Sequence, residues 1–382
     1  MKKRILFING HLNLGGIERS LVDILRNFDC SKYDVDLMLF QGEGDYRDEI
    51  SSGINIYSYD VTTTYGPLLQ TLWKAFISLS LFQFLYRLAT SLGKPLVIMK
   101  LFCTPCHKHY DVVISFRPGL SNSIATKCIN AHKHISWWHH GEMNLSRAEK
   151  QVLSEEYRLC DKIVTVSKSC TRMLQQEFTK CVGKFVTIPN MICTDEILAK
   201  SILFKPARAN ALNIVTVGRL TPEKNTSFCI DIASRLKSQN IPFHWNIIGG
   251  GEEYDNLCQK IVRNDVSDFV TLLGPLSNPY PYIANSDIYF HPSLVESQGL
   301  TILEAMTLGI PTISVASDGP KEYITNGRNG ILIEPSVNEA VIAISQIYSN
   351  SSFKEGIVTA GYHTINQFSP KSTITKIEHL ID

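Results

Sequence analysis

Short apolar runs alternate with amphipathic helical stretches along this chain, and this alternation limits the fold most strongly. The first cycle is a strand-like run at residues 4–9, a helical pattern over residues 17–28 and a second run at residues 35–40. The order strand, turn, helix, strand is the start of a doubly wound parallel sheet. Further short apolar runs with polar flanks indicate buried parallel strands at residues 111–115, 134–138 and 162–166.

A second cycle begins past the middle of the chain. Residues 213–217 form an apolar run that ends in Gly218, and a helical pattern at residues 227–236 precedes another run at residues 243–248. Later strands are expected at residues 270–273, 288–290, 312–315 and 331–333. Since 382 residues exceed one ordinary hydrophobic core, the chain is predicted to form two successive α/β domains with a boundary near residue 190.

The overall charge and the cysteines restrict the partners and the compartment. The formal net charge of +1 creates no general attraction for nucleic acid, so an anionic ligand requires a local group of cations. The first apolar run, residues 5–8, is shorter than the roughly 7–15 residues of a signal peptide core. The ten cysteines show no framework spacing, which predicts reduced thiols and a cytoplasmic location.

Two segments depart from the α/β pattern. Residues 103–109 contain C-x-x-C-H, but without an export signal or a second group of ligands we expect loop cysteines and no metal or haem. Residues 65–102 are rich in apolar side chains, and their longest charge-free stretch, residues 75–86, is shorter than the roughly 20 residues of a membrane span. Two interpretations of residues 65–102 stay open: helices lying on a membrane surface, or a helical insertion packed on its own domain.

Three separate pieces of sequence suit an anionic ligand. Gly15 and Gly16 stand between the first strand and its helix, where the backbone can approach a phosphate closely. Arg219 and Lys224 follow the first strand of the second cycle, at the end of a parallel strand where such sheets bind ligands. Arginine offers a fork of donors and lysine a compact charge, although a pair of solvated surface cations explains the same residues.

The third piece runs from Glu296 to Glu304. Glu296 is expected in a loop after a strand, and a helix is expected to start at Gly299. The unpaired N–H groups of Gly299, Leu300 and Thr301 would then face an anion, and Glu304 on the second turn would accept hydrogen bonds from sugar hydroxyls. A helix-dipole partner and a surface carboxylate are the simpler interpretations of the two glutamates.

Taken together, these motifs resemble the family 4 retaining glycosyltransferases. The resemblance is carried by five motifs in order: G-G-I-E-R at residues 15–19, G-R-L with E-K at residues 218–224, E-x7-E at residues 296–304, G-P-K-E at residues 319–322 and N-G-x-N-G at residues 326–330. It covers nearly all of the second domain and both ends of the first. Departures are the missing second glycine before Pro320 and the pair Ser297–Gln298, which leaves the choice of sugar open.

The resemblance implies a GT-B fold, in which two Rossmann-like domains face a cleft. Residues 1–190 would be the acceptor-side domain, completed by a C-terminal helix over residues 364–382, and residues 191–363 would bind the nucleotide sugar. Arg219, Lys224 and the helix start would hold the diphosphate, Glu304 the ribose, and Gly16 would close over the diphosphate. Glu296 and His139 would act at the transferred sugar, with His140 as the alternative histidine.

The implied activity is transfer of a hexose-type sugar, with retention, to a glycan acceptor. No metal or other cofactor is expected, because cations and helix dipoles can stabilise the leaving diphosphate. A lipid-linked acceptor for surface polysaccharide would explain the apolar segment 65–102, and it predicts peripheral attachment to the cytosolic face of a membrane.

Three other functions can be compared with this one. A nicotinamide dehydrogenase is disfavoured because Gly249, Gly250 and Gly251 lack the third glycine of G-x-G-x-x-G. A GT-B sugar-nucleotide epimerase and a non-catalytic sugar-nucleotide-binding subunit stay open.

Overall fold

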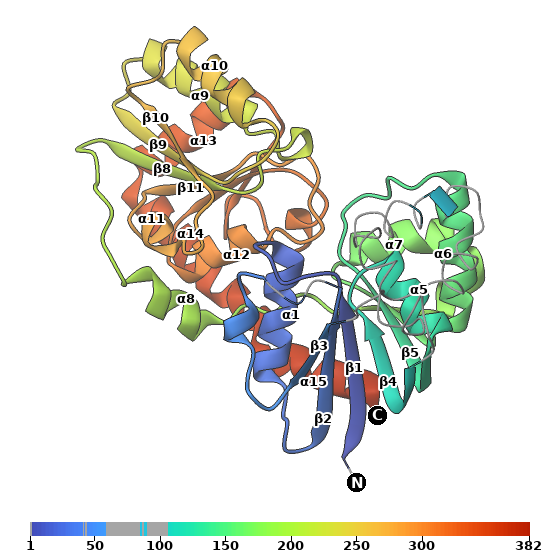
Figure 1. Cartoon of the computed structure of the whole chain (residues 1–382). Coiled ribbons are helices and arrows are strands. Elements are labelled where there is room, and N and C mark those ends of the chain that lie inside the picture. Colours follow the sequence, from blue (N-terminus) through green and yellow to red (C-terminus); the bar gives the residue numbers. More distant parts are fainter. Residues whose placement is uncertain (1, 41, 43, 59–84, 86–87, 90–105) are drawn as a thin grey trace, which may run out of the picture. The chain divides into compact units, whose positions relative to one another are not determined.

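The chain forms two compact units. The structure is a computed structural model that describes residues 2–40, 42, 44–58, 85, 88–89 and 106–382. Unit 1 comprises Met1–Pro189 and Thr373–Asp382, and unit 2 comprises Asn190–Ser372. The chain therefore leaves unit 1 after Pro189 and returns to it for its last ten residues. Figure 1 labels helices and strands of both units.

Unit 1 is built on a parallel sheet with the order β3-β2-β1-β4-β5-β6-β7 among the described residues. In the centre of the sheet, Ile5 pairs with Val35 on one side and with Val112 on the other. The apolar runs of the sequence supply the inner strands, while the edge strands β3 and β7 were not predicted. The strands are β1 (Lys3–Asn9), β2 (Tyr33–Leu39), β3 (Asn55–Ser58), β4 (Cys106–Ser115), β5 (Ile129–Trp138), β6 (Lys162–Thr165) and β7 (Phe185–Thr187).

The helices of unit 1 cover this sheet through buried apolar side chains. Helix α1 buries Leu21 and Leu25, and Phe28 at its end meets Phe7 of β1 with ring centroids 6.0 Å apart. Helix α15 buries Ile377 and Ile381, and Lys3 pairs with Asp382 beyond the end of the helix at 2.8 Å. The helices are α1 (Gly16–Asn27), α5 (Leu120–Lys127), α6 (Arg147–Leu159), α7 (Lys168–Glu177) and α15 (Pro370–Ile381), with 3-10 turns at Arg47–Glu49 and Thr179–Lys184.

Unit 2 repeats the doubly wound plan with the order β10-β9-β8-β11-β12-β13, and all its strand pairs are parallel. The strands are β8 (Leu212–Val217), β9 (Phe243–Ile248), β10 (Val270–Gly274), β11 (Ile288–His291), β12 (Thr312–Val315) and β13 (Ile331–Ile333). The helices are α8 (Thr194–Ser201), α9 (Ser227–Ser238), α10 (Tyr254–Arg263), α11 (Tyr280–Ala284), α12 (Leu300–Thr307), α13 (Val337–Ser349) and α14 (Ser351–Ile365), with 3-10 turns at Pro222–Lys224, Pro320–Glu322 and Asn366–Phe368. Both sheets are thus α/β Rossmann-like sheets, as the sequence predicts.

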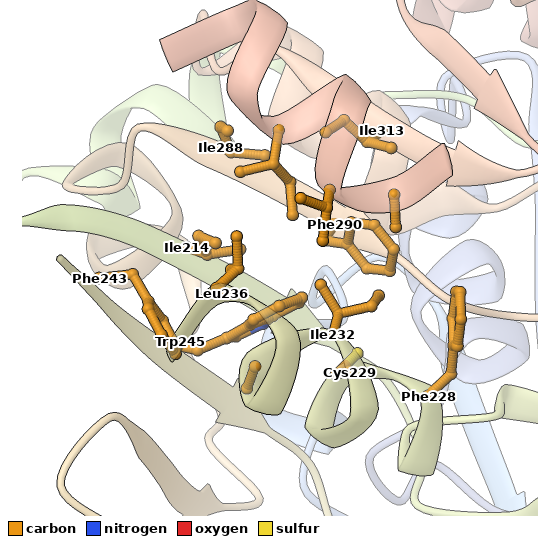
Figure 2. Packing of buried hydrophobic residues seen from close by; sticks show 14 of the residues in the cluster. Ile214, Phe228, Cys229, Ile232, Leu236, Phe243, Trp245, Ile288, Phe290 and Ile313 are labelled. Atoms are coloured by element: carbon orange, nitrogen blue, oxygen red, sulfur yellow. The ribbon is translucent and has the colours of Figure 1, made fainter. Parts of the chain in front are cut away.

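A large apolar core fixes the central strands of unit 2 (Figure 2). Phe290 of β11 lies against Trp245 of β9, with ring centroids 5.2 Å apart, and Phe228 of α9 packs on Phe290. The polar groups in this core are satisfied, because Trp245 donates from Nε1 to Thr216 Oγ1 at 3.1 Å and Thr216 donates to the Phe290 carbonyl at 2.8 Å. The loops that leave β8 and β11 therefore start from rigid strands.

Two predicted segments fall largely outside the described residues. The C-x-x-C pair begins at Cys103, which is not described, and most of the apolar segment 65–102 is not described either. Among the helices that are described, none combines the length and the apolar character needed to cross a membrane.

Candidate active site

The predicted donor-binding residues of unit 2 lie where β8 and β11 end. These strands are neighbours in the sheet, with Ile288 opposite Ile214 and Tyr289 opposite Val215. After them, the Leu294 N–H donates to the Glu223 carbonyl at 3.0 Å, which joins the two loops. The structure therefore brings together Lys224 and Glu296, which are 72 positions apart in the chain.

Glu296 is a largely buried carboxylate with two partners. Its Oε1 lies 2.5 Å from Lys224 Nζ and 2.9 Å from His291 Nε2, and its side chain is 10% exposed. Burial raises the pKa of this carboxyl, but the Lys224 charge and the His291 hydrogen bond outweigh burial and lower the pKa to about 2. Glu296 is therefore a fixed negative charge at neutral pH and does not exchange a proton there.

His291 belongs to a hydrogen-bonded chain that the sequence analysis missed. Its Nδ1 lies 3.2 Å from the Tyr289 hydroxyl, and this hydroxyl donates to Thr301 Oγ1 at 2.6 Å. Burial raises the pKa of Tyr289, so the hydroxyl stays protonated. The contacts thus connect Glu296 with the first turn of α12. One available signal was the position of His291, directly after an apolar run at the expected ligand-binding edge.

Helix α12 begins directly after Gly299. Gly299 has a φ of 79°, in the left-handed region that favours glycine, and α12 runs from Leu300 to Thr307. The first N–H groups of any helix lack partners within the helix, which makes this end suitable for an anion. On the next turn, Glu304 accepts a hydrogen bond from the Tyr280 hydroxyl at 3.2 Å.

Arg219 stands apart from the pair of Lys224 and Glu296. Its side chain is 70% exposed, and its nearest acidic partner is Glu223, with Nη2 and Oε1 3.4 Å apart. Such a weak, exposed pair contributes little to stability and leaves the guanidinium available to a ligand.

The glycine triplet at residues 249–251 has a packing role. A Cβ atom on Gly249 would lie 1.8 Å from the Gly218 carbonyl oxygen, and one on Gly251 would lie 2.3 Å from the Leu220 carbonyl oxygen. These close approaches explain Gly249 and Gly251 without a dinucleotide, so the triplet gives no support to the dehydrogenase hypothesis.

In unit 1, Gly15 and Gly16 stand at the start of α1, as the sequence predicts. A Cβ atom on Gly15 would lie 2.3 Å from Glu18 Oε2, since the Glu18 side chain folds back over the helix start. Glu18 is buried, and its Oε1 lies 3.2 Å from Arg117 Nη1. Sequence reasoning gave no role to Glu18 or Arg117. The space beside Gly15 is therefore partly occupied by a side chain of the same helix.

His139 follows β5 and is buried, whereas its neighbour His140 is exposed. The His139 ring lies against Phe116 and stacks on Trp137, with centroid distances of 4.5 and 6.0 Å. Neither ring nitrogen has a hydrogen-bond partner among the described residues. Burial, together with the charges of His140 and Arg117, holds the pKa of His139 well below its usual value of 6.5. His139 is thus a neutral imidazole with two unused polar atoms.

The sequence of the chain is similar to known glycosyltransferases. Residues 202–364 match the family Glycosyl transferases group 1. An uncharacterized glycosyltransferase of Haemophilus influenzae is 25% identical over 354 residues, which are 92% of this chain and 91% of that protein. The lipopolysaccharide core biosynthesis glycosyltransferase LpsE of Rhizobium meliloti is 29% identical over 184 residues, or 48% of this chain and 53% of that protein.

The fold is also shared with solved glycosyltransferase structures. The structure of HepE from Anabaena in complex with UDP-glucose has a TM-score of 0.74 and 18% identity, and the alignment covers 98% of each chain. This match extends over both units, whereas the family match lies within unit 2. Residues 202–364 thus match a glycosyltransferase family, and the two Rossmann-like sheets share their fold with solved glycosyltransferases.

Proposed function

We propose that this chain transfers a hexose-type sugar from a nucleotide diphosphate sugar to a glycan acceptor, with retention of the anomeric configuration. The observation that carries the proposal is the partly buried ion pair of Lys224 and Glu296 beside the start of α12. A nucleotide diphosphate sugar carries both an anionic diphosphate and neutral hydroxyl groups. The pair and the helix start offer a matching partner for each of these parts.

The leaving diphosphate explains the cations and the helix start. As the glycosidic bond breaks, negative charge grows on the diphosphate oxygens, and fixed donors stabilise this charge more in the transition state than in the ground state. Arg219, Lys224 and the N–H groups of Gly299, Leu300 and Thr301 supply these donors. No metal is needed for this role, and Glu304 would accept a hydrogen bond from the ribose.

Glu296 and His139 would act at the sugar itself. A carboxylate with a pKa of about 2 does not serve as a general acid at neutral pH, but it accepts hydrogen bonds and stabilises positive charge at the anomeric carbon. A neutral imidazole gives and accepts one hydrogen bond, which suits a sugar hydroxyl. The glycines at residues 15–16 would approach the diphosphate with their backbone.

The acceptor is proposed to be a glycan, lipid-linked, in surface polysaccharide synthesis. This assignment is supported by a relative in lipopolysaccharide core biosynthesis. A sugar-nucleotide epimerase would use the same donor site without an acceptor, and transfer to a second molecule separates the two activities. Peripheral attachment to the cytosolic face of a membrane is part of the proposal, and flotation of the full chain with liposomes tests it.

A panel of UDP-, GDP- and ADP-hexoses tests the donor. One donor should raise the midpoint of thermal unfolding, because a ligand that binds the native state stabilises it. Incubation of that donor with lipid-linked glycan should then give a product whose anomeric configuration NMR can read. If no nucleotide sugar shifts the midpoint, the proposal is wrong.

A further inference from the structure

Gln298 lies between Glu296 and the helix start and bonds to a distant part of unit 2. Its side chain is buried, at 3% exposure of the residue. Its Oε1 accepts from the Asn190 N–H at 2.8 Å, and its Nε2 donates to the Asn190 carbonyl at 3.0 Å. The amide thus pairs with both main-chain groups of one residue that is 108 positions away.

Asn190 is the first residue of unit 2, directly after the chain leaves unit 1. Two positions later, the Ile192 N–H donates to the Phe368 carbonyl at 2.8 Å, close to where the chain returns at Thr373. We call residues 190–192 the crossing segment. The crossing segment is therefore bonded both to the return of the chain and, through Gln298, to the loop that bears Glu296.

The rest of this loop is also held firmly. The Gly319 N–H donates to the Glu296 carbonyl at 3.1 Å, and the Tyr323 hydroxyl donates to the Gln298 carbonyl at 2.9 Å. A Cβ atom on Gly319 would lie 2.6 Å from the Ser297 carbonyl carbon, so the two loops are in backbone contact. Because these contacts hold the Glu296 loop in place, a displacement of the crossing segment also displaces the backbone next to Glu296.

We infer that Gln298 is a positioning residue that couples the site at Glu296 to the crossing segment. This inference rests on the proposed donor site. A ligand that orders the Glu296 loop also stabilises the hydrogen bonds from Gln298 to Asn190. By reciprocity, an ordered crossing segment favours the ligand-binding geometry of the loop. An apolar side chain at position 298 fills the same space but does not couple the Glu296 loop to the crossing segment, because it lacks the two polar atoms.

The Asn190 amide proton reports on this coupling directly, because it is the proton donated to Gln298. The experiment measures hydrogen exchange at Asn190 and Ile192 in the full chain, with and without saturating UDP, GDP or ADP. In the wild-type protein, the nucleotide that binds should slow exchange of the Asn190 amide by about tenfold, the size expected from one or two hydrogen bonds.

The substitution Gln298→Met removes both hydrogen bonds while keeping the length of the side chain. This variant should bind the same nucleotide within about threefold of the wild-type affinity, yet lose the slowing at Asn190 and about tenfold in kcat with little change in donor KM. Gln259→Met is the matched control, since Gln259 is exposed on α10. It should behave as the wild type.

The inference is overturned if nucleotide binds the wild-type protein without slowing Asn190, or if Gln298→Met still shows the slowing. The first result needs no variant, so an unstable Gln298→Met protein does not weaken the test. Failure of the proposed donor site gives a different result, because no nucleotide would then bind even the wild-type protein.

Discussion

In unit 2 the largely buried carboxylate of Glu296 has two charged or polar partners, whereas in unit 1 the buried imidazole of His139 has no hydrogen-bond partner among the described residues. A buried ion needs partners to offset its desolvation, and Lys224 and His291 provide them. A neutral imidazole costs far less to bury. Unit 2 thus holds an ion pair that is formed without a ligand, while unit 1 holds a buried polar group for which the proposed function supplies the sugar as partner.

The largest effect is expected from Lys224→Met. Without Lys224, the Glu296 carboxylate stays buried with only His291 beside it, which should lower the free energy of unfolding by about 3 kcal/mol. Transfer should fall by about a thousandfold, since a donor to the diphosphate is lost as well. Chemical denaturation and a transfer assay measure the two effects.

The double variant Lys224→Met, Glu296→Gln separates stability from chemistry. It removes both charges, so most of the lost stability should return while transfer stays low. If the Lys224→Met protein transfers sugar within tenfold of the wild-type rate, the proposed site is contradicted.

The pH dependence of stability isolates the charge on Glu296. Its carboxyl has a pKa of about 2 in the folded chain, against an ordinary value of 4.5. A lowered folded-state pKa contributes stability that is complete above the ordinary value and is lost as the pH falls from about 4.5 toward 2. The contribution is at most about 3 kcal/mol.

Urea denaturation between pH 7 and pH 2.5 measures this contribution. The Glu296→Gln protein should lose less stability over that range than the wild type. Glu252→Gln, at an exposed position, is the control and should keep the wild-type slope. Equal slopes for all three proteins would mean that the Glu296 pKa is not lowered.

His139→Phe should show most clearly how the site residues of the two units differ in their effect on stability. The ring fits the aromatic surroundings and removes two buried polar atoms, so the free energy of unfolding should stay the same or rise by about 1 kcal/mol. Transfer should fall by about thirtyfold if the imidazole bonds a sugar hydroxyl.

The exposed neighbour supplies the control, since His140→Phe should leave transfer unchanged. If His139→Phe destabilises the protein as strongly as Lys224→Met does, the histidine has a structural role instead.

The smallest effect is expected from Arg219→Gln. Because Arg219 is exposed and weakly paired, its loss should change the free energy of unfolding by less than about 0.5 kcal/mol. The donor dissociation constant should rise by about tenfold, through the loss of a charged donor to the diphosphate. Calorimetric titration with the donor measures this change, and exposed Arg235→Gln is the control. An unchanged affinity would remove Arg219 from the site.

The inner strands were predictable because a strand buried on both faces of a parallel sheet reads as a continuous apolar run. Strands β3 and β7 are at the sheet edges, and none of their residues whose burial is described is buried, so their sequences lack such a run. Lys224 and Glu296 were predicted from their motifs, but their contact comes from the neighbouring ends of β8 and β11. The role of Gln298 depends on the backbone of Asn190, and no local pattern encodes a contact across 108 positions.

The return of the chain to unit 1 has a consequence for synthesis. Thr373–Asp382 belongs to unit 1, although all of unit 2 lies between these residues and the rest of that unit. A ribosome releases the C-terminus last, so every residue of unit 2 is already made when unit 1 receives its final helix. The unit whose strands emerge first is therefore the unit completed last. The sheet surface beneath α15 stays exposed to solvent until that helix has been made.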